Sequence, residues 1–365
     1  MLAIRAKLAA GERLGPADAL YLVRDAPLLE LGELANELRF QRHPLPQVSF
    51  VVDTNLNYTN RCDAYCSFCA FYRPHTSTAS DAYTFSVDAM LDRIGAAVAM
   101  GCTTVLMQGG LNPELPLRYY VEMVRCTRTR FPDLTPHFWS APEIHEMSKV
   151  AGLTYKQVLQ ELWDAGQTTL PGGGAEILTN RVRHAISPLK MDADAWIAVH
   201  RAAHAVGFRG TATMMYGHVE APEDVVEHFE RIRALQDETG GFTAFVPWSF
   251  ALGDTPLGRK VKTRATANAY LRIIAAARVY LDNFEHIDAS WFSEGKKTGQ
   301  VALHFGADDF GGTLFDESVM QEAGHYVRTT VEEMRAMIRE AGFVPVQRNT
   351  LYQTLHVFDD VPVAG

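Results

Sequence analysis

The sequence has few cysteines and no long apolar run. Five of its 365 residues are cysteine, and three of the five fall within eight residues, so the paired disulfides of a small secreted domain are not expected. No uninterrupted apolar run reaches the roughly 18 residues of a membrane-spanning helix. The N-terminal stretch M-L-A-I-R-A-K-L-A-A-G lacks the apolar h-region of a signal peptide. These absences predict a protein of the reducing cytoplasm that has no membrane partner.

Positive charge is also scarce. The formal net charge is −9, so a nucleic-acid partner would gain little electrostatic support and is not expected. Apolar residues make up 47% and charged residues 21%, which are the proportions of an ordinary globular protein, and there is no low-complexity segment. A length of 365 residues fits one large barrel or two domains.

The sequence does contain a regular alternation of apolar, strand-like segments with segments of helical periodicity. Residues 2–40 have helical spacing of apolar residues, and the H-P-L-P run at 43–46 ends that pattern. The alternation that follows favours a parallel α/β fold. We predict a (β/α)8 TIM-type barrel over residues 46–365, preceded by an N-terminal helical extension over residues 1–45. The predicted strands lie at 48–53, 103–110, 136–140, 168–176, 210–218, 242–248 and 286–291, and the predicted helices at 116–129, 153–166, 192–206, 222–238 and 266–282.

Chemically notable residues follow several of the predicted strands. In barrels of this type the active site lies at the carboxyl ends of the strands. Three cysteines follow the first predicted strand, Q-G-G at 108–110 ends the second, and P-G-G-G-A-E at 171–176 ends the fourth. His218 and Trp291 follow later strands. Their common placement supports both the barrel and a single site at that end of it.

The cysteines Cys62, Cys66 and Cys69 have the spacing C-x3-C-x2-C. Thiolates suit zinc and iron–sulfur clusters, but a structural zinc site uses four protein ligands and a four-iron cluster is normally closed by four cysteines. Three cysteines would leave one iron free to bind a substrate or cofactor. The alternative is a structural zinc site that borrows a remote histidine, in an interaction module rather than an enzyme. Cys102 and Cys126 stand in apolar or helical segments and are interpreted as buried small side chains.

Two glycine-rich turns accompany the cysteines. Gly109 and Gly110 follow an apolar strand, where glycine lets the backbone approach a ligand closely. The P-G-G-G-A-E turn has three successive glycines but no G-K-[ST], which argues against a phosphate-binding loop. Its Glu176 either accepts hydrogen bonds from the ribose hydroxyls or ammonium group of a cofactor, or is a first-turn carboxylate of an ordinary helix.

The cysteine spacing, with the aromatic Phe68 just before the third cysteine, resembles the radical S-adenosylmethionine (SAM) superfamily. The resemblance implies a [4Fe–4S] cluster whose open iron binds the amino and carboxylate groups of SAM. An electron from a donor such as flavodoxin or ferredoxin then leads to cleavage of SAM into methionine and a 5′-deoxyadenosyl radical. The implied metal ligands are Cys62, Cys66 and Cys69, and the implied SAM contacts are Phe68, Gln108, Gly109, Gly110 and Glu176.

Longer strings resemble one group within that superfamily, the radical SAM enzymes of the futalosine pathway to menaquinone. The strings extend from about Phe50 to the terminal R-N-T-L-Y and include N-L-N-Y-T-N-R-C, C-S-F-C-A-F-Y-R, Q-G-G-L-N-P-E-L-P-L, P-G-G-G-A-E-I-L and M-M-Y-G-H-V-E. Cyclic dehypoxanthine futalosine synthases are the closer match, through C-A-F-Y-R, V-P-W and A-S-W. The sister aminofutalosine synthases and the deazaflavin-forming radical SAM synthases are the alternatives.

For a cyclase, the resemblance implies a small-molecule substrate, dehypoxanthine futalosine. The deoxyadenosyl radical takes a hydrogen from its ribose, the ribosyl radical attacks the benzoate ring, and the cyclised radical loses an electron and a proton. That reaction needs a base, a carboxylate anchor and a dry cavity. The candidates for the base are His218 and Asp288, those for the anchor are Arg73, Arg209 and Lys296, and those for the walls of the substrate site are Trp248 and Trp291.

Overall fold

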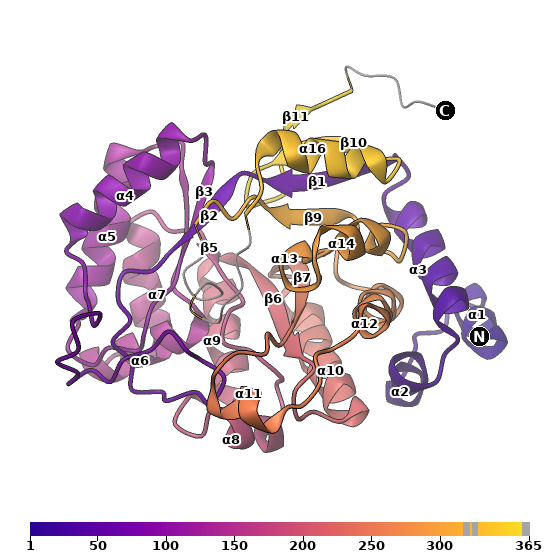
Figure 1. Ribbon diagram of the computed structural model, residues 1–365, viewed down its shortest axis with the longest axis horizontal. Coiled ribbons are helices and arrows are strands. Elements are labelled where there is room, and N and C mark those ends of the chain that lie inside the picture. The colour runs from indigo at the N-terminus through magenta and orange to yellow at the C-terminus, as the bar shows by residue number, and fades with distance from the viewer. Residues whose placement is uncertain (317–321, 323–327, 360–365) are drawn as a thin grey trace.

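The computed structural model describes residues 1–316, 322 and 328–359 of the chain. Helices come first, and strands and helices alternate from Gln47 onward (Figure 1). The strands are β1 (Gln47–Val51), β2 (Asp53–Leu56), β3 (Thr104–Met107), β4 (Thr135–Phe138), β5 (Thr169–Leu170), β6 (Arg209–Tyr216), β7 (Phe242–Ser249), β8 (His286–Ile287), β9 (Asp309–Gly312), β10 (Val344–Arg348) and β11 (Thr354–Val357). The helices are α1 (Leu2–Ala9), α2 (Pro16–Arg24), α3 (Leu28–Arg42), α4 (Val87–Ala99), α5 (Leu117–Arg130), α6 (Ala141–Ala151), α7 (Tyr155–Asp164), α8 (Asn180–Ile186), α9 (Ala193–Val206), α10 (Pro222–Thr239), α11 (Pro256–Lys260), α12 (Ala267–Tyr280), α13 (Trp291–Glu294), α14 (Lys296–Ala302) and α16 (Val331–Glu340). Within the described ranges, no helix is both long enough and apolar enough to cross a membrane.

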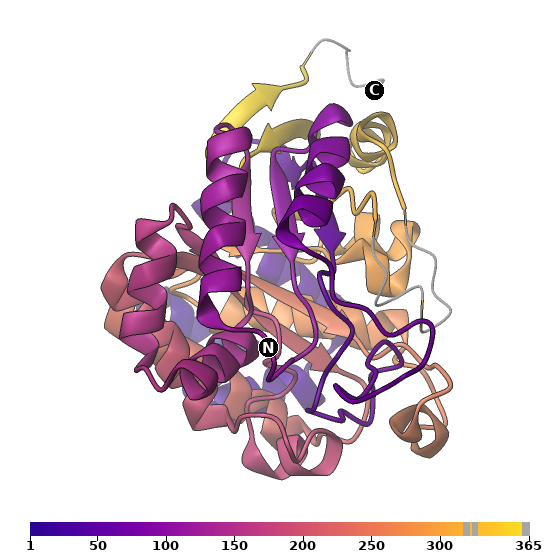
Figure 2. The ribbon, with the colours of Figure 1, turned by 90° about the vertical axis from the view of Figure 1, so that its left-hand side faces the viewer.

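Parallel strands close into a barrel with helices around its outside (Figures 1 and 2). β1 and β2 form one bent strand; β2 pairs with β3 and β3 with β4, while β5, β6, β7 and β8 pair in that order. Gln167 joins the two groups, because its Nε2 donates to the Phe138 carbonyl at 2.6 Å. β9 completes the ring, since it pairs with β1 and bridges to the end of β8. The arrangement confirms the predicted (β/α)8 TIM-type barrel.

The observed elements differ from the predicted ones at several places near the cavity. The strand predicted over 168–176 is only β5, because the glycine-rich turn begins directly after it. The strand predicted over 286–291 is only β8, and α13 begins at Trp291. The strand predicted over 136–140 ends at Phe138, and Ser140 instead forms a capping box with Glu143 at the start of α6. Strand β9 was not predicted at all, although it closes the barrel.

The last two strands lie beside β1 at the amino-terminal end of the barrel. β10 pairs in parallel with β1, on the same edge of the bent strand that pairs with β3 through its second half, β2. β11 then folds back antiparallel to β10. Arg348 is the last residue of β10 and lies in the barrel interior. The C-terminal hairpin therefore contributes a charged side chain to the inside of a barrel that is otherwise built from earlier strands.

The N-terminal helices α2 and α3 pack on the outer face of α10 and α12 (Figure 1). α12 is buried along most of its length, because it lies between these helices and the barrel. Polar contacts fix the arrangement: Arg13 forms ion pairs with Asp237 and Asp282, and Arg272 donates to the Ala26 carbonyl at 2.6 Å.

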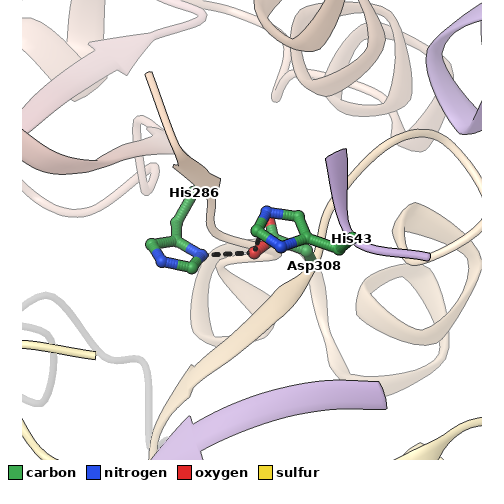
Figure 3. Close-up of side chains that lie close together, drawn as sticks. All are labelled: His43, His286 and Asp308. Carbon is green, nitrogen blue, oxygen red and sulfur yellow. Dashed lines mark hydrogen bonds and ion pairs between the residues drawn. The ribbon is translucent and has the colours of Figure 1, made fainter. Parts of the chain in front are cut away.

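A polar cluster around Asp308 lies at the amino-terminal end of the barrel (Figure 3). Asp308 forms a buried ion pair with Arg278 and accepts a hydrogen bond from the Ile287 backbone N–H at 2.9 Å. His286 Nδ1 lies 2.5 Å and His43 Nε2 lies 3.4 Å from its other carboxylate oxygen. Two imidazoles and a carboxylate this close are also a possible set of metal ligands. Arg278 already neutralises the carboxylate, however, so the cluster is balanced in charge without an ion.

Replacing Asp308 by asparagine should lower the free energy of unfolding by about 3–5 kcal/mol, because the buried Arg278 guanidinium would lose its counter-ion. Urea unfolding of the anaerobic protein, followed by circular dichroism, measures the change. The matched control is Asp254→Asn: this carboxylate pairs with Arg259 while its side chain is 95% exposed, so its loss should cost less than about 1 kcal/mol. Equal losses in the two variants would contradict the role given to burial of the Arg278 pair.

Candidate active site

A cavity of about 410 Å³ extends from the barrel interior to the carboxyl ends of the strands. Its outer part is lined by the cysteine segment and both glycine-rich turns, and its inner end, the floor, is lined by Asp53, Asp288 and Arg348. The residues predicted for the site that lie on its wall are Cys62, Cys66, Cys69, Phe68, Gln108, Gly109, Gly110, Glu176, Trp248 and Asp288. The barrel therefore brings residues from the ends of several strands onto one concave surface.

The cysteine segment is fixed to the rest of the barrel at both ends. The Asp63 N–H donates to the Leu111 carbonyl at 3.1 Å, and the Ser67 hydroxyl donates to the Ile186 carbonyl at 2.9 Å. All three thiols are free, and burial raises their pKa values, that of Cys66 to about 12. A thiol that lines a cavity becomes a ligand when a metal displaces its proton. The three thiols fit a cluster that has three protein ligands and one open position.

The Q-G-G turn packs directly against the cysteine segment. A Cβ on Gly110 would lie 2.1 Å from the Arg61 carbonyl oxygen and 2.8 Å from Cys62 Cβ. The second turn is equally close to the first, because a Cβ on Gly173 would lie 2.2 Å from the Gln108 amide nitrogen. A side chain at Gly110 would push these backbone segments apart, and one at Gly173 would displace the side chain of Gln108. The glycines thus allow both turns to approach a ligand beside the thiols.

Glu176 is buried at the end of the second turn and pairs with two cations. Its carboxylate lies 3.0 Å from Lys190 Nζ and 3.3 Å from Arg183 Nη1. Burial by itself would raise the pKa of Glu176, but Lys190 and Arg183 outweigh burial and lower it, so the group is ionised. Lys190 also lines the cavity, with Nζ 5.9 Å from the centre of the Phe68 ring. This ion pair presents one negative and one positive group next to the cysteine segment.

Replacing Glu176 by glutamine should weaken SAM binding about 10- to 100-fold and leave the visible spectrum of the cluster unchanged. The expected size is that of one charge-assisted hydrogen bond, and the amide has the same shape as the carboxylate. Equilibrium dialysis of labelled SAM against the anaerobic reconstituted protein measures the affinity. Glu238→Gln is the control, because that residue pairs with Arg201 on the surface. Unchanged affinity in Glu176→Gln would restrict Glu176 to neutralising its two cations.

The floor of the cavity is a charged cluster around Arg348. Arg348 Nε and Nη2 donate to the two oxygens of Asp309 at 2.5 and 2.8 Å, and its guanidinium carbon lies 3.8 Å from the centre of the Tyr352 ring. Burial raises the pKa of Asp53 to about 6, so this group is ionised at neutral pH. Burial and the neighbouring Asp309 raise the pKa of Asp288 well above its ordinary value, which favours its protonated form. The floor thus offers a guanidinium, a basic carboxylate and a carboxylic acid.

A second cavity, of about 270 Å³, lies at the amino-terminal end of the barrel. Its lining includes His43, His286 and Asp308 of the cluster in Figure 3. Arg348 and Tyr352 line both cavities, so these two side chains form part of the partition between them. The ring of Tyr352 stacks on that of His286, with centroids 3.8 Å apart.

His218, predicted as a base, is not part of the described lining of the larger cavity. Its side chain is fully buried, its Nε2 lies 2.9 Å from the Met215 carbonyl, and its Nδ1 accepts a hydrogen bond from the Val219 N–H at 2.8 Å. Both ring nitrogens are therefore engaged by the backbone of the turn after β6. This geometry favours a structural role for the imidazole.

The three cations predicted as carboxylate anchors also lie away from the described cavity wall. Arg73 pairs with Asp81, Lys296 pairs with Glu333, and Arg209 stands at the start of β6, the opposite end of that strand from the cysteines. The other predicted or considered residues outside the lining are Trp291, Cys102 and Cys126. The cations that the structure places on the wall are Lys190 and Arg348.

Sequence reasoning missed Asp53, Lys190 and Arg348, which line the cavity. Each carried a signal. Asp53 directly follows a buried apolar run, Lys190 ends the string I-S-P-L-K, and Arg348 begins R-N-T-L-Y.

Comparisons with known proteins identify the family of this chain. The family model of the Radical SAM superfamily matches residues 56–232, and that of the CofH/MqnC C-terminal region matches residues 239–361. The cyclic dehypoxanthine futalosine synthase of Halalkalibacterium halodurans is 38% identical over 97% of this chain and 95% of its own length. The aminodeoxyfutalosine synthase of Thermus thermophilus is 38% identical over 99% and 97%, and the 5-amino-6-(D-ribitylamino)uracil–L-tyrosine 4-hydroxyphenyl transferase of Methanopyrus kandleri is 41% identical over 85% of each chain.

The crystal structure of methylornithine synthase (PylB) has the same fold, with a TM-score of 0.72 at 16% identity over 94% of this chain and 97% of that one. The radical SAM superfamily uses a [4Fe–4S] cluster together with SAM, and the free thiols of the cysteine segment fit that cluster. The protein is therefore an enzyme and not a zinc-bound interaction module. The chain belongs to the radical SAM superfamily, in the group that carries the CofH/MqnC C-terminal region.

Proposed function

We propose that this enzyme converts dehypoxanthine futalosine to cyclic dehypoxanthine futalosine in menaquinone biosynthesis. The observation that carries the proposal is the cavity floor, where the buried guanidinium of Arg348 and the basic carboxylate of Asp53 line the same surface. A benzoate needs the first as an anchor, and a ring that must lose a proton needs the second. The nearly full-length similarity to the cyclase of H. halodurans supports the same substrate.

The proposed reaction removes two hydrogens from the substrate. The cluster and SAM, when bound at the cysteine end of the cavity, supply a 5′-deoxyadenosyl radical. The substrate gives up one hydrogen atom from its ribose, and the new carbon radical bonds to the benzoate ring. The ring regains its aromaticity by losing one electron and one proton. A carrier such as flavodoxin or ferredoxin reduces the enzyme beforehand, and the oxidised form of such a carrier can accept the electron that leaves the ring.

Arg348 is the proposed anchor for the benzoate carboxylate. A guanidinium has five N–H donors, and three of them are used in the structure: two on Asp309 and one, from Nη1, on the Asn349 carbonyl at 3.1 Å. Two donors are left for a ligand, and the planar guanidinium suits a carboxylate. A substrate held at the floor in this way extends its ribose toward the cysteine segment.

Asp53 is the proposed base, and Asp288 is a hydrogen-bond donor rather than a base. A base works best when its pKa lies just below the working pH, which is the case for Asp53, with a pKa of about 6. Burial and Asp309 raise the pKa of Asp288 and so favour its protonated form. In this form it can donate to the substrate carboxylate without repelling it.

Glu176 and Lys190 are proposed to hold the two charged groups of the methionine part of SAM. They form an ion pair on the cavity wall beside the cysteine segment. An amino acid zwitterion carries the complementary pair of charges, so the ammonium group suits Glu176 and the carboxylate suits Lys190. Phe68, Gln108, Gly109 and Gly110 complete the proposed SAM contacts from the same part of the wall.

The substrate decides between this proposal and its alternatives. Protein reconstituted with iron and sulfide under anaerobic conditions is mixed with SAM, a reductant and one candidate substrate, and the products are identified by mass spectrometry. We expect cyclised product, two hydrogens lighter than dehypoxanthine futalosine, in step with 5′-deoxyadenosine. Product from an enol-ether benzoate would support the second candidate, aminofutalosine synthesis, which the T. thermophilus relative favours. Product from tyrosine and a ribitylaminouracil would assign the chain to the transferases instead.

A further inference from the structure

Glu143 is a buried carboxylate behind the Q-G-G turn that the proposed reaction does not use. It is the third residue of α6 and is 1% exposed. Its Oε1 accepts hydrogen bonds from the Tyr58 hydroxyl at 2.8 Å and the Gly109 N–H at 3.0 Å. Its Oε2 accepts from the Ser140 N–H at 2.7 Å and the Ser140 hydroxyl at 2.6 Å. Four neutral donors, two on each oxygen, therefore surround one side chain.

These four donors come from the loops that follow three neighbouring strands. Tyr58 follows β2, Gly109 follows β3 and Ser140 follows β4. The contacts are tight, because a Cβ on Gly109 would lie 2.5 Å from the Tyr58 ring. Glu143 thus joins the carboxyl ends of β2, β3 and β4 at one point. A helix cap alone would require only the bonds to Ser140.

The hydrogen bonds of the turn determine which of its groups can meet a ligand. The Gly109 N–H is held by Glu143, and the Gly110 N–H donates to the Thr59 carbonyl at 2.9 Å. In a trans peptide the carbonyl points opposite to the N–H of the next residue. The Gly109 carbonyl therefore points away from Thr59, and no hydrogen bond from the described residues reaches the carbonyl oxygens of Gly109 and Gly110. Both glycines line the cavity, so the turn offers acceptors to it.

We propose that Glu143 is a positioning residue for SAM. Glu143 bonds the N–H of the Gln108–Gly109 peptide, and the Asn57 amide donates to the carbonyl of the same peptide at 2.7 Å, so that the turn is fixed and the next two carbonyl oxygens, of Gly109 and Gly110, are presented to the SAM amino group. This inference rests on the proposed SAM contact of that turn, but it does not depend on which organic substrate the enzyme takes. Glu143 acts through the backbone of Gly109 and does not itself line the cavity within the described residues.

Glutamine at position 143 cannot satisfy all four donors. An amide has one acceptor oxygen and one NH₂ group, which is itself a donor. If the NH₂ group faces Gly109, the turn loses its hydrogen bond. If it faces Ser140, the N–H of Ser140 loses its acceptor and α6 loses its cap. The Tyr58 and Ser140 hydroxyls can rotate to accept from the amide, but a backbone N–H cannot.

The test compares Glu143→Gln with Glu333→Gln in the holoenzyme, reconstituted with its cluster. Glu333 is also the third residue of a helix, α16, but bonds Lys296 and Thr329 on the surface. The measurements are made at pH 8, because burial raises the pKa of Glu143 to about 7 and its carboxylate form dominates above that value. Equilibrium dialysis gives the SAM dissociation constant, and the electron paramagnetic resonance of the reduced cluster reports SAM binding independently of turnover.

We expect Glu143→Gln to raise the SAM dissociation constant about 10-fold, with the iron content retained and the KM of the organic substrate changed less than about 2-fold. Glu333→Gln should change neither constant. Unchanged SAM affinity in Glu143→Gln would overturn the inference. An equal rise in the SAM dissociation constant and in the KM of the organic substrate would also overturn it. If Glu143→Gln does not fold, Tyr58→Phe decides, because it removes the other bond to Oε1 and so loosens the carboxylate that holds the Gly109 N–H. The inference requires a smaller but measurable loss of SAM affinity there, and no loss would refute it.

Discussion

Cys66→Ala protein should form no 5′-deoxyadenosine above the background of a cluster-free sample. The thiol of Cys66 lines the cavity between two other cysteines of the same segment, and a four-iron cluster left with two protein ligands is not held stably. The protein should still fold, because the bonds of Asp63 and Ser67 fix the segment to other loops. Iron and sulfide analysis, with chromatography of the SAM cleavage products, gives the result.

Cys102→Ala is the matched control for this change. Cys102 is buried in the hydrophobic core and is not part of the described cavity lining, so its variant should keep the iron content and the cleavage rate of the parent. Loss of iron in Cys102→Ala would mean that the ligand set is wrong. Cleavage of SAM by Cys66→Ala at the parent rate would also mean that the ligand set is wrong.

Asp53→Asn protein should still form 5′-deoxyadenosine with the substrate bound, but the yield of cyclised product per deoxyadenosine should fall about 100- to 10,000-fold, the range typical of a lost acid–base group. The proton must leave late, after SAM cleavage, so the early steps do not depend on Asp53. The pKa of about 6 also sets a pH dependence. Above pH 7 the parent protein should form one cyclised product for each deoxyadenosine. This ratio should fall as the pH falls through 6, because the carboxylate of Asp53 then takes up a proton.

Asp288→Asn is the matched control on the same floor. Burial and Asp309 favour the protonated form of Asp288, so we expect the neutral amide to replace it with little loss in the yield of cyclised product per deoxyadenosine. Full coupling in Asp53→Asn together with uncoupling in Asp288→Asn would reverse the two assignments and return the base to the residue that the sequence predicted. His218→Ala should keep the parent's yield of cyclised product per deoxyadenosine, because both imidazole nitrogens of His218 bond to the backbone and not to a substrate.

The barrel was predictable because most of its strands and helices are followed directly by a turn sequence that marks where they end. Glycine-rich turns and helical periodicity locate most strands within a few residues. Strand β9 was missed because D-F-G-G has two glycines and no apolar alternation, and it is a strand only because β1 and the end of β8 lie on either side of it. Pairing partners of this kind are far away in the sequence and cannot be read from a local pattern.

The outer part of the site was predictable and the floor was not. The cysteines and glycine turns have fixed spacings within short segments, so their chemistry shows in the sequence itself. Arg348 reaches the interior from a strand almost 300 residues after β1, and nothing local distinguishes it from a surface arginine. The choice between Asp53 and Asp288 depends on burial and on Asp309, which only the folded chain supplies.

Because Arg348 and Tyr352 form part of the partition between the two cavities, the C-terminal hairpin closes the amino-terminal end of the barrel. On one side lies the cavity in which a carbon radical would form, and on the other a second cavity at the amino-terminal end. Asp309 holds Arg348 in place, and His286 supports Tyr352 from below. A chain that ends before β10 would have the same cysteines and the same turns, yet its barrel would be open to water and oxygen from behind. The last strands thus protect the chemistry that the first loops begin.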